Sequence, residues 1–125
     1  MRYETVGEMP LTQLPGRAIR KSIGKDGGIK SDAMTFGRTC FSLQYGKMAP
    51  HCHAEEIIYV LDAAAGSCRY GSTEECADGE VMLKKDMVLH IRPMEWHVFE
   101  FTDPKGYADV LFFYAQVENL RPEEK

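Results

Sequence analysis

Residues 51–61 read His51-Cys52-His53-Ala54-Glu55-Glu56-Ile57-Ile58-Tyr59-Val60-Leu61. The apolar run 57–61 has no polar face and is too short to be a free-standing helix, so it predicts a strand that is buried on both sides. Two histidines and two carboxylates stand directly before this strand. A buried strand that begins next to such side chains places polar chemistry at the edge of a hydrophobic core.

The sequence on either side of this run repeats the same pattern of short strands. Apolar and β-branched segments recur about every eight to twelve residues between turn residues, and no amphipathic helical stretch of convincing length interrupts them. The expected strands are 17–23, 39–45, 57–61, 67–70, 80–83, 87–91, 97–102 and 109–117. The fold class is therefore all-β, a sandwich or barrel over 36–117, with an N-terminal arm (1–35) in the same domain and a C-terminal tail (118–125).

Length and charge exclude several classes of protein. The chain has 125 residues, enough for about one domain, and a domain of this size builds a core without structural staples. Fifteen basic against nineteen acidic residues give a net charge of -4, with no basic run, so a nucleic-acid partner is not expected. The sequence has neither a secretory signal nor an apolar stretch of about eighteen residues, which predicts a cytoplasmic protein that does not enter the membrane.

The histidines are the strongest candidates for chemistry. On an extended backbone, side chains two residues apart point the same way, so His51 and His53 can aim both imidazoles at one point. Glu56 joins them if the short link at 54–55 turns the chain. The next strand after Pro93 opens on His97. Imidazoles and a carboxylate that converge from strand ends form a metal-ligand set.

Two segments carry a family resemblance. Gly46-x4-His51-x-His53-x2-Glu56-x6-Ala63 resembles the first cupin motif, and Asp86-x6-Pro93-x3-His97 resembles the second. The likeness spans about Phe41 to Phe101. It implies a small single-domain cupin, a double-stranded β-helix or jelly roll, with His51, His53, Glu56 and His97 as the metal ligands.

The chain departs from the family pattern in two respects. Only two residues separate His53 from the carboxylate, where the family usually has three or four, so Glu55 is the alternative ligand to Glu56. Ala63, Asp86 and Met94 stand where the family has glycines. Because other residues resist a positive φ, we expect these turns to follow a different backbone path.

The four-ligand set also bears on the metal and on the function. Four protein ligands would close a tetrahedral zinc site, whereas iron, manganese, nickel or cobalt would keep two positions open. We therefore expect a metalloenzyme of the oxygenase, isomerase or lyase type that acts on an oxygenated small metabolite. The alternative is a non-catalytic, metal-dependent protein that binds a sugar or effector. Glu55, Tyr45 and Tyr59 are the candidate bases for proton transfer.

Two further expectations concern thiols and assembly. All four cysteines are expected to be reduced, although Cys68 and Cys76 flank a turn and could pair. A homodimer is expected, in which strand 17–23 of the arm covers a sheet edge of the neighbouring subunit. The alternative is that the arm folds back on its own barrel. His90 is expected to be an ordinary packed or solvated side chain.

Overall fold

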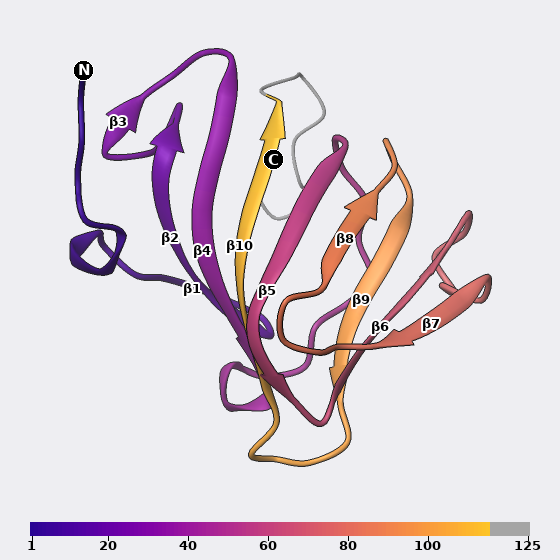
Figure 1. Ribbon diagram of the computed structural model, residues 1–125. Helices are drawn as coiled ribbons and strands as arrows, with labels where there is room; N and C mark the ends of the chain where they lie inside the picture. The colour runs from indigo at the N-terminus through magenta and orange to yellow at the C-terminus, as the bar shows by residue number, and fades with distance from the viewer. Residues whose placement is uncertain (116–125) are drawn as a thin grey trace.

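The computed structural model describes residues 1–115, which form two β-sheets (Figure 1). The expected strand 109–117 is described only as far as residue 115, and the tail 118–125 lies outside the described residues. The strands are β1 (Thr12–Leu14), β2 (Arg17–Gly24), β3 (Ile29–Lys30), β4 (Met34–Ser42), β5 (Glu56–Ala64), β6 (Gly66–Gly71), β7 (Gly79–Met82), β8 (Val88–Ile91), β9 (Trp96–Phe101) and β10 (Tyr107–Ala115). The all-β prediction is confirmed.

The larger sheet has the order β1-β2-β4-β10-β5-β8, with β3 beside β2, and the smaller sheet has the order β7-β6-β9. Strand β10 lies in the middle of the larger sheet, antiparallel to both β4 and β5. The chain crosses between the sheets where β5 turns into β6 and where β9 runs on to β10, at the lower end of Figure 1. The two layers thus enclose one core.

The core lies between the inward faces of the two sheets. Alternate residues of β5 and β10 are buried, as the period of two in a half-buried strand requires. The expectation that 57–61 is buried on both sides is therefore wrong, because Ile57 is 45% exposed on the outer face of the sheet. Val60 and Val110 pair across these strands and are fully buried. No helix among the described residues is long and apolar enough to cross a membrane.

The arm is built into the larger sheet of its own chain. Strand β2 pairs antiparallel with β4, so that Arg17 lies opposite Phe41 and Ile19 opposite Thr39. The backbone therefore takes the second of the two arrangements expected for the arm. The homodimer itself stays a prediction, but exchange of this strand is not needed to cover the edge of β4.

The expected strand 39–45 ends early. Residues Leu43–Tyr45 form a 3-10 helix, because the hydroxyl of Ser42 accepts a hydrogen bond from the Gln44 N–H at 3.2 Å and turns the chain. Gly46 follows with φ 91, a conformation that favours glycine.

The expectation that the glycine-replaced turns follow a different path is wrong at two positions. Asp86 (φ 70) and Met94 (φ 59) both adopt the left-handed conformation. The Asp86 N–H donates to the Val60 carbonyl at 2.8 Å, and the Met94 N–H donates to the His53 carbonyl at 2.7 Å. Tertiary hydrogen bonds therefore hold both turns in a conformation that their own residues resist.

Candidate metal centre

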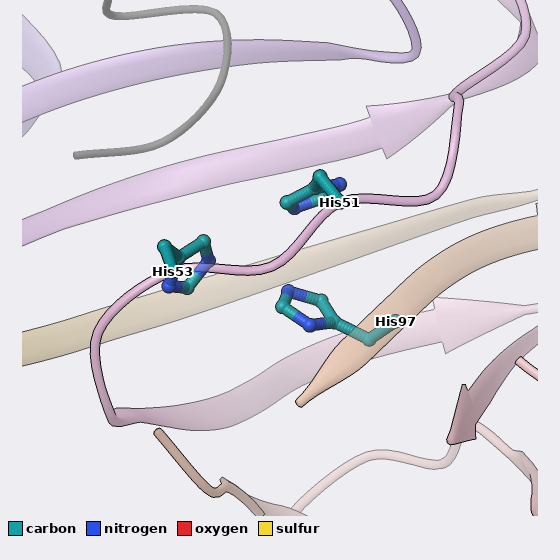
Figure 2. Close-up of side chains that lie close together, drawn as sticks. All are labelled: His51, His53 and His97. Carbon is teal, nitrogen blue, oxygen red and sulfur yellow. The ribbon is translucent and has the colours of Figure 1, made fainter. Parts of the chain in front are cut away.

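Three histidines from two distant segments meet inside the barrel (Figure 2). His51 and His53 lie on the segment that leads into β5, and His97 is the second residue of β9. The backbones of His51 and His97 form an isolated bridge, with N–H to carbonyl distances of 3.1 and 2.9 Å. Together with the bond from Met94 to His53, this bridge fixes the histidine segment against the start of β9.

Each imidazole is oriented by a main-chain carbonyl. The Nδ1 atom of His51 lies 3.2 Å from the Ala49 oxygen, that of His53 lies 2.8 Å from the Ala54 oxygen, and that of His97 lies 2.8 Å from the Glu95 oxygen. A carbonyl can only accept, so each Nδ1 carries a proton, and in the neutral form of each ring the lone pair lies on Nε2. Ligating histidines in metalloproteins are oriented in this way.

The three rings converge closely enough to share one ion. One ring nitrogen from each histidine lies within 4.8 Å of the other two, and the ring centroids of His51 and His97 are 4.4 Å apart. All three side chains are buried, with His97 only 1% exposed. Three convergent imidazoles in a buried site are a donor set suited to a divalent transition metal.

The buried carboxylate next to this cluster is Glu56. Its side chain is 3% exposed and its Oε1 atom lies 3.5 Å from Nε2 of His53. Glu56 stands at the rim of the three-histidine group and is not among the atoms within 4.8 Å of one another. A bend at Ala54 lets it share the inward face of β5 with Ile58. Of the two candidate carboxylates, this is the one that faces the histidines.

Glu55 faces the opposite way. Its carboxylate pairs with His90 on the surface, where both side chains are 56% exposed. His90 is thus a solvated side chain, as expected. Tyr59 lies on the outer side of β5, where its hydroxyl donates to Asp86, and Tyr45 is half-buried in the 3-10 helix. None of the three candidate bases lines the histidine cavity.

The cavity at the three histidines is small and has both polar and apolar walls. It measures about 10 Å³, room for an ion or a single water molecule. It is lined by Arg17, Thr39, Phe41, His51, His53, Glu56, Ile58, His97, Phe99 and Phe112. Phenylalanine rings from three strands, Phe41, Phe99 and Phe112, form its apolar part, and Phe41 and Phe99 stack with 4.1 Å between their centroids.

Arg17 is a wall residue that the sequence did not single out. It is 4% exposed, and its Nη1 atom donates to the Pro15 carbonyl at 2.9 Å. Arg17 lies two residues before the buried Ile19 on β2, so the two side chains share one face of the strand. This spacing was the one signal in the sequence that Arg17 would point inward. Thr39, from the neighbouring β4, enters the wall in the same way.

Electrostatics keep at least one ligand candidate neutral. Burial, followed by the nearby His97 and Arg17, lowers the pKa of His51 to about 2. At physiological pH protons therefore do not compete with a metal ion for this imidazole, and a neutral imidazole is the form that binds metal.

The cysteines take no part in the cluster. All four are free thiols, so Cys68 and Cys76 do not pair. Burial is the main cause that raises the pKa of Cys68, to about 12. The thiol therefore stays protonated and unreactive in the folded protein.

Comparison with known proteins identifies the type of fold. No family model and no curated protein matches the chain. Among solved structures, a cupin-like protein from Thermotoga maritima superimposes with a TM-score of 0.59 at 18% identity, over 83% of this chain and 71% of that one. The fold is cupin-like.

Two other cupin-like matches are similar in extent. The polyketide cyclase RemF from Streptomyces resistomycificus gives a TM-score of 0.65 at 23% identity, over 98% of this chain and 82% of that one. Fe(II)-HppE, solved with an alternative substrate, gives a TM-score of 0.67 at 10% identity, over 91% of this chain and 60% of that one. At these identities the likeness extends to the fold and no further.

Proposed function

We propose that the protein is a metal-dependent enzyme in which His51, His53 and His97 hold a divalent transition metal that receives an oxygenated small molecule. The observation that carries this proposal is the set of three Nδ1 to carbonyl contacts, which turns three Nε2 lone pairs toward one buried point.

Glu56 is the proposed fourth ligand, because its carboxylate is buried beside His53. Three nitrogen atoms and one oxygen atom suit iron, manganese, nickel or cobalt, which retain two further positions, better than a catalytic zinc, which keeps three protein ligands. Iron is supported by its presence in the cupin-like Fe(II)-HppE. When bound, such an ion supplies Lewis acidity or dioxygen activation.

The wall favours oxygen chemistry over proton transfer. Isomerases and lyases need a base within reach of the substrate. Among the described residues of the wall, Glu56 is the only carboxylate and is engaged as a ligand in this proposal, while Thr39 and Arg17 are poor bases. The phenylalanines exclude water from the site, which protects reactive species from side reactions.

A second function is favoured by the size of the cavity. A space of about 10 Å³ admits an ion but not a metabolite unless the wall moves. This supports a non-catalytic, metal-dependent binding protein as the alternative. In the simplest version of that alternative, the site is closed to small molecules and the ion only stabilises the fold.

The test begins with protein purified without chelator or nickel resin. Elemental analysis should find about one transition metal per chain, and metal-free protein should take up one equivalent of Fe(II) or Co(II) under anaerobic conditions. The visible spectrum of the Co(II) protein then reports on a panel of 2-oxo acids, hydroxy acids, catechols and sugars.

The outcomes separate the two functions. Oxygen consumption with product formation from a compound that perturbs the Co(II) spectrum supports the enzyme. A compound that changes the Co(II) spectrum but is not converted to product with any of the proposed metals supports the binding protein. Failure to take up a stoichiometric metal contradicts both.

A further inference from the structure

A buried arginine lies in the wall of the histidine cavity, and the proposed function does not use it. Arg17 is the first residue of β2 and is only 4% exposed. It lines the same small cavity as the three histidines and Glu56. Arginine stays charged in proteins, and it is rarely buried unless its charge is balanced. The wall therefore contains a fixed positive charge beside a site for a metal cation.

The structure fixes the position of this charge. Arg17 lies opposite Phe41 in the ladder between β2 and β4, and its Nη1 atom donates to the Pro15 carbonyl at 2.9 Å. A main-chain carbonyl satisfies a donor of the guanidinium group but carries no net charge that would balance it. Thr39, the other polar residue that these two strands contribute to the wall, is also uncharged. The charge of Arg17 therefore acts on whatever the cavity binds.

The charges of the cavity do not balance when a divalent ion is bound. Each histidine is neutral when it binds an ion through Nε2 and keeps its proton on Nδ1. The ion brings two positive charges and Arg17 brings one, whereas Glu56 brings one negative charge and the other lining residues are uncharged. Two positive charges thus remain in a buried site, where an unbalanced charge is costly. A negatively charged ligand offsets this cost, and a neutral ligand does not.

The shape of the arginine side chain limits the class of anion. A guanidinium group presents paired N–H donors that match the two oxygen atoms of a carboxylate. Two positions remain on a six-coordinate ion after the four proposed protein ligands. A carboxylic acid with a hydroxyl or carbonyl oxygen on the adjacent carbon can fill both positions and still keep one carboxylate oxygen for the arginine.

A larger cavity beside the histidine cavity offers room for the rest of such a molecule. It measures about 380 Å³, a size typical of small-molecule sites. Phe99 lines both cavities. Gly16 and Ser42 of the larger cavity are chain neighbours of Arg17 and Phe41 of the smaller one. The two spaces are therefore adjacent, and Phe99 is the ring that has to move for an acid to reach both.

We propose that Arg17 selects the ligand of the metal centre, and that this ligand is a small 2-hydroxy or 2-oxo acid in its carboxylate form. The proposal rests on the proposed function, because the charge balance includes the metal ion. Removal of the arginine charge should weaken binding of the acid. It should not weaken binding of the metal, since a neighbouring positive charge repels the ion. Loss of a residue with a merely structural role would weaken both.

The first test compares two ligands that differ in charge but hardly in shape. The visible spectrum of the Co(II) protein is titrated with glycolate and with glycolamide, and the same titrations are made with the Co(II) ion in buffer. The protein's preference for the acid over the amide should exceed that of the ion in buffer by about tenfold or more, because Arg17 adds a charge-assisted contact. A preference no larger than that of the ion in buffer overturns the proposal.

The second test assigns the preference to Arg17. Arg17→Gln removes the charge and Arg17→Lys retains it, while Arg38→Gln is the matched control, because Arg38 pairs with Asp109 at the surface and its side chain is 47% exposed. In Arg17→Gln the preference for glycolate should fall by about tenfold or more, and the dissociation constant of Co(II) should stay the same or decrease. Arg17→Lys should keep most of the preference and Arg38→Gln all of it. An unchanged preference in Arg17→Gln, or weaker metal binding by that variant, overturns the proposal.

The outcomes distinguish this proposal from the proposed function. If the wild type takes up no metal, the proposed function fails and this proposal fails with it. If the wild type takes up metal but Arg17→Gln keeps the preference for the acid, only this proposal fails. Circular dichroism shows whether Arg17→Gln folds. If it does not fold, the comparison of the wild type with the Co(II) ion in buffer decides the matter.

Discussion

Replacement of His53 by alanine is the sharpest test of the metal centre. His53 contributes one of the three convergent rings and lies beside Glu56. The change removes a ligand but none of the apolar side chains of the core. We therefore expect His53→Ala to fold and to lose its metal.

The magnitude can be worked out from linkage. A metal present at 100 times its dissociation constant stabilises the folded state by about 2.7 kcal/mol. Unfolding entropy of roughly 2.1 cal/mol/K per residue amounts to about 0.26 kcal/mol/K for a chain of 125 residues, so the melting temperature should rise by about 10 °C. If the change weakens affinity by about 100-fold, the stabilisation falls to about 0.4 kcal/mol and the shift to under about 2 °C.

The assay is thermal unfolding by circular dichroism with and without added metal, combined with elemental analysis. His90→Ala is the matched control, because His90 is a histidine of β8 that lies at the surface, away from the cluster. The control should keep both the metal and the shift. Retention of a 10 °C shift and of one metal equivalent by His53→Ala would refute the reasoning. Loss of the fold on its replacement would instead indicate a structural ion.

Four other changes have definite expected outcomes. Glu56→Gln should weaken metal binding by about tenfold or more, measured by competition with a chelating dye; an unchanged affinity would remove this carboxylate from the ligand set. In metal-free protein, burial above all lowers the pKa of His51 to about 2, while an unfolded histidine titrates near 6.5. Below about pH 6.5 the unfolded chain therefore binds a proton at His51 that the folded chain does not bind. The free energy of unfolding should fall by about 1.4 kcal/mol for each pH unit below that value. A urea midpoint that is constant from pH 7 to pH 5 would contradict the lowered pKa. Met94→Gly should raise the melting temperature by up to about 4 °C, because the Met94 side chain is 46% exposed and its backbone φ of 59 is strained. Met94→Val should lower the melting temperature, since a β-branched residue resists this φ more strongly. The reverse order of melting temperatures would show that the turn stores no strain. Cys68 should resist alkylation at pH 8 until the protein is denatured, which mass spectrometry after tryptic digestion would show; rapid labelling in the native state would contradict its burial.

Local patterns in the sequence were sufficient for most of the strands and for the inward direction of the histidines, although β1 and β3 were not expected and β4 begins at Met34, earlier than the expected residue 39. The run 57–61 lies inside β5, and the two-residue parity of His51 and His53 holds although neither lies in a regular strand. Strand pattern depends on neighbouring residues alone, so a sequence can carry it. The prediction of strand 39–45 was wrong at its end for an equally local reason, the hydroxyl cap of Ser42 on the following turn.

Features that depend on contacts across the chain could not be predicted. The left-handed φ of Asp86 and Met94 runs against their own preference and is held by carbonyls from β5 and from the histidine segment. Which of the two carboxylates, Glu55 or Glu56, faces the histidines depends on the bend at Ala54, because the bend sets which residues of β5 point inward. Both outcomes follow from the energy of the assembled sheet and not from the residue itself.

The sequence by itself determined an all-β chain with two histidines and a carboxylate at the start of a strand, because alternation and spacing are one-dimensional properties. Only the tertiary structure decided what surrounds them. It brought Arg17 and Thr39 into the wall of the histidine cavity through the pairing of β2 with β4. It also placed His97 beside His51 and His53, since the backbone hydrogen bonds between His51 and His97 form only once β9 has docked against the histidine segment.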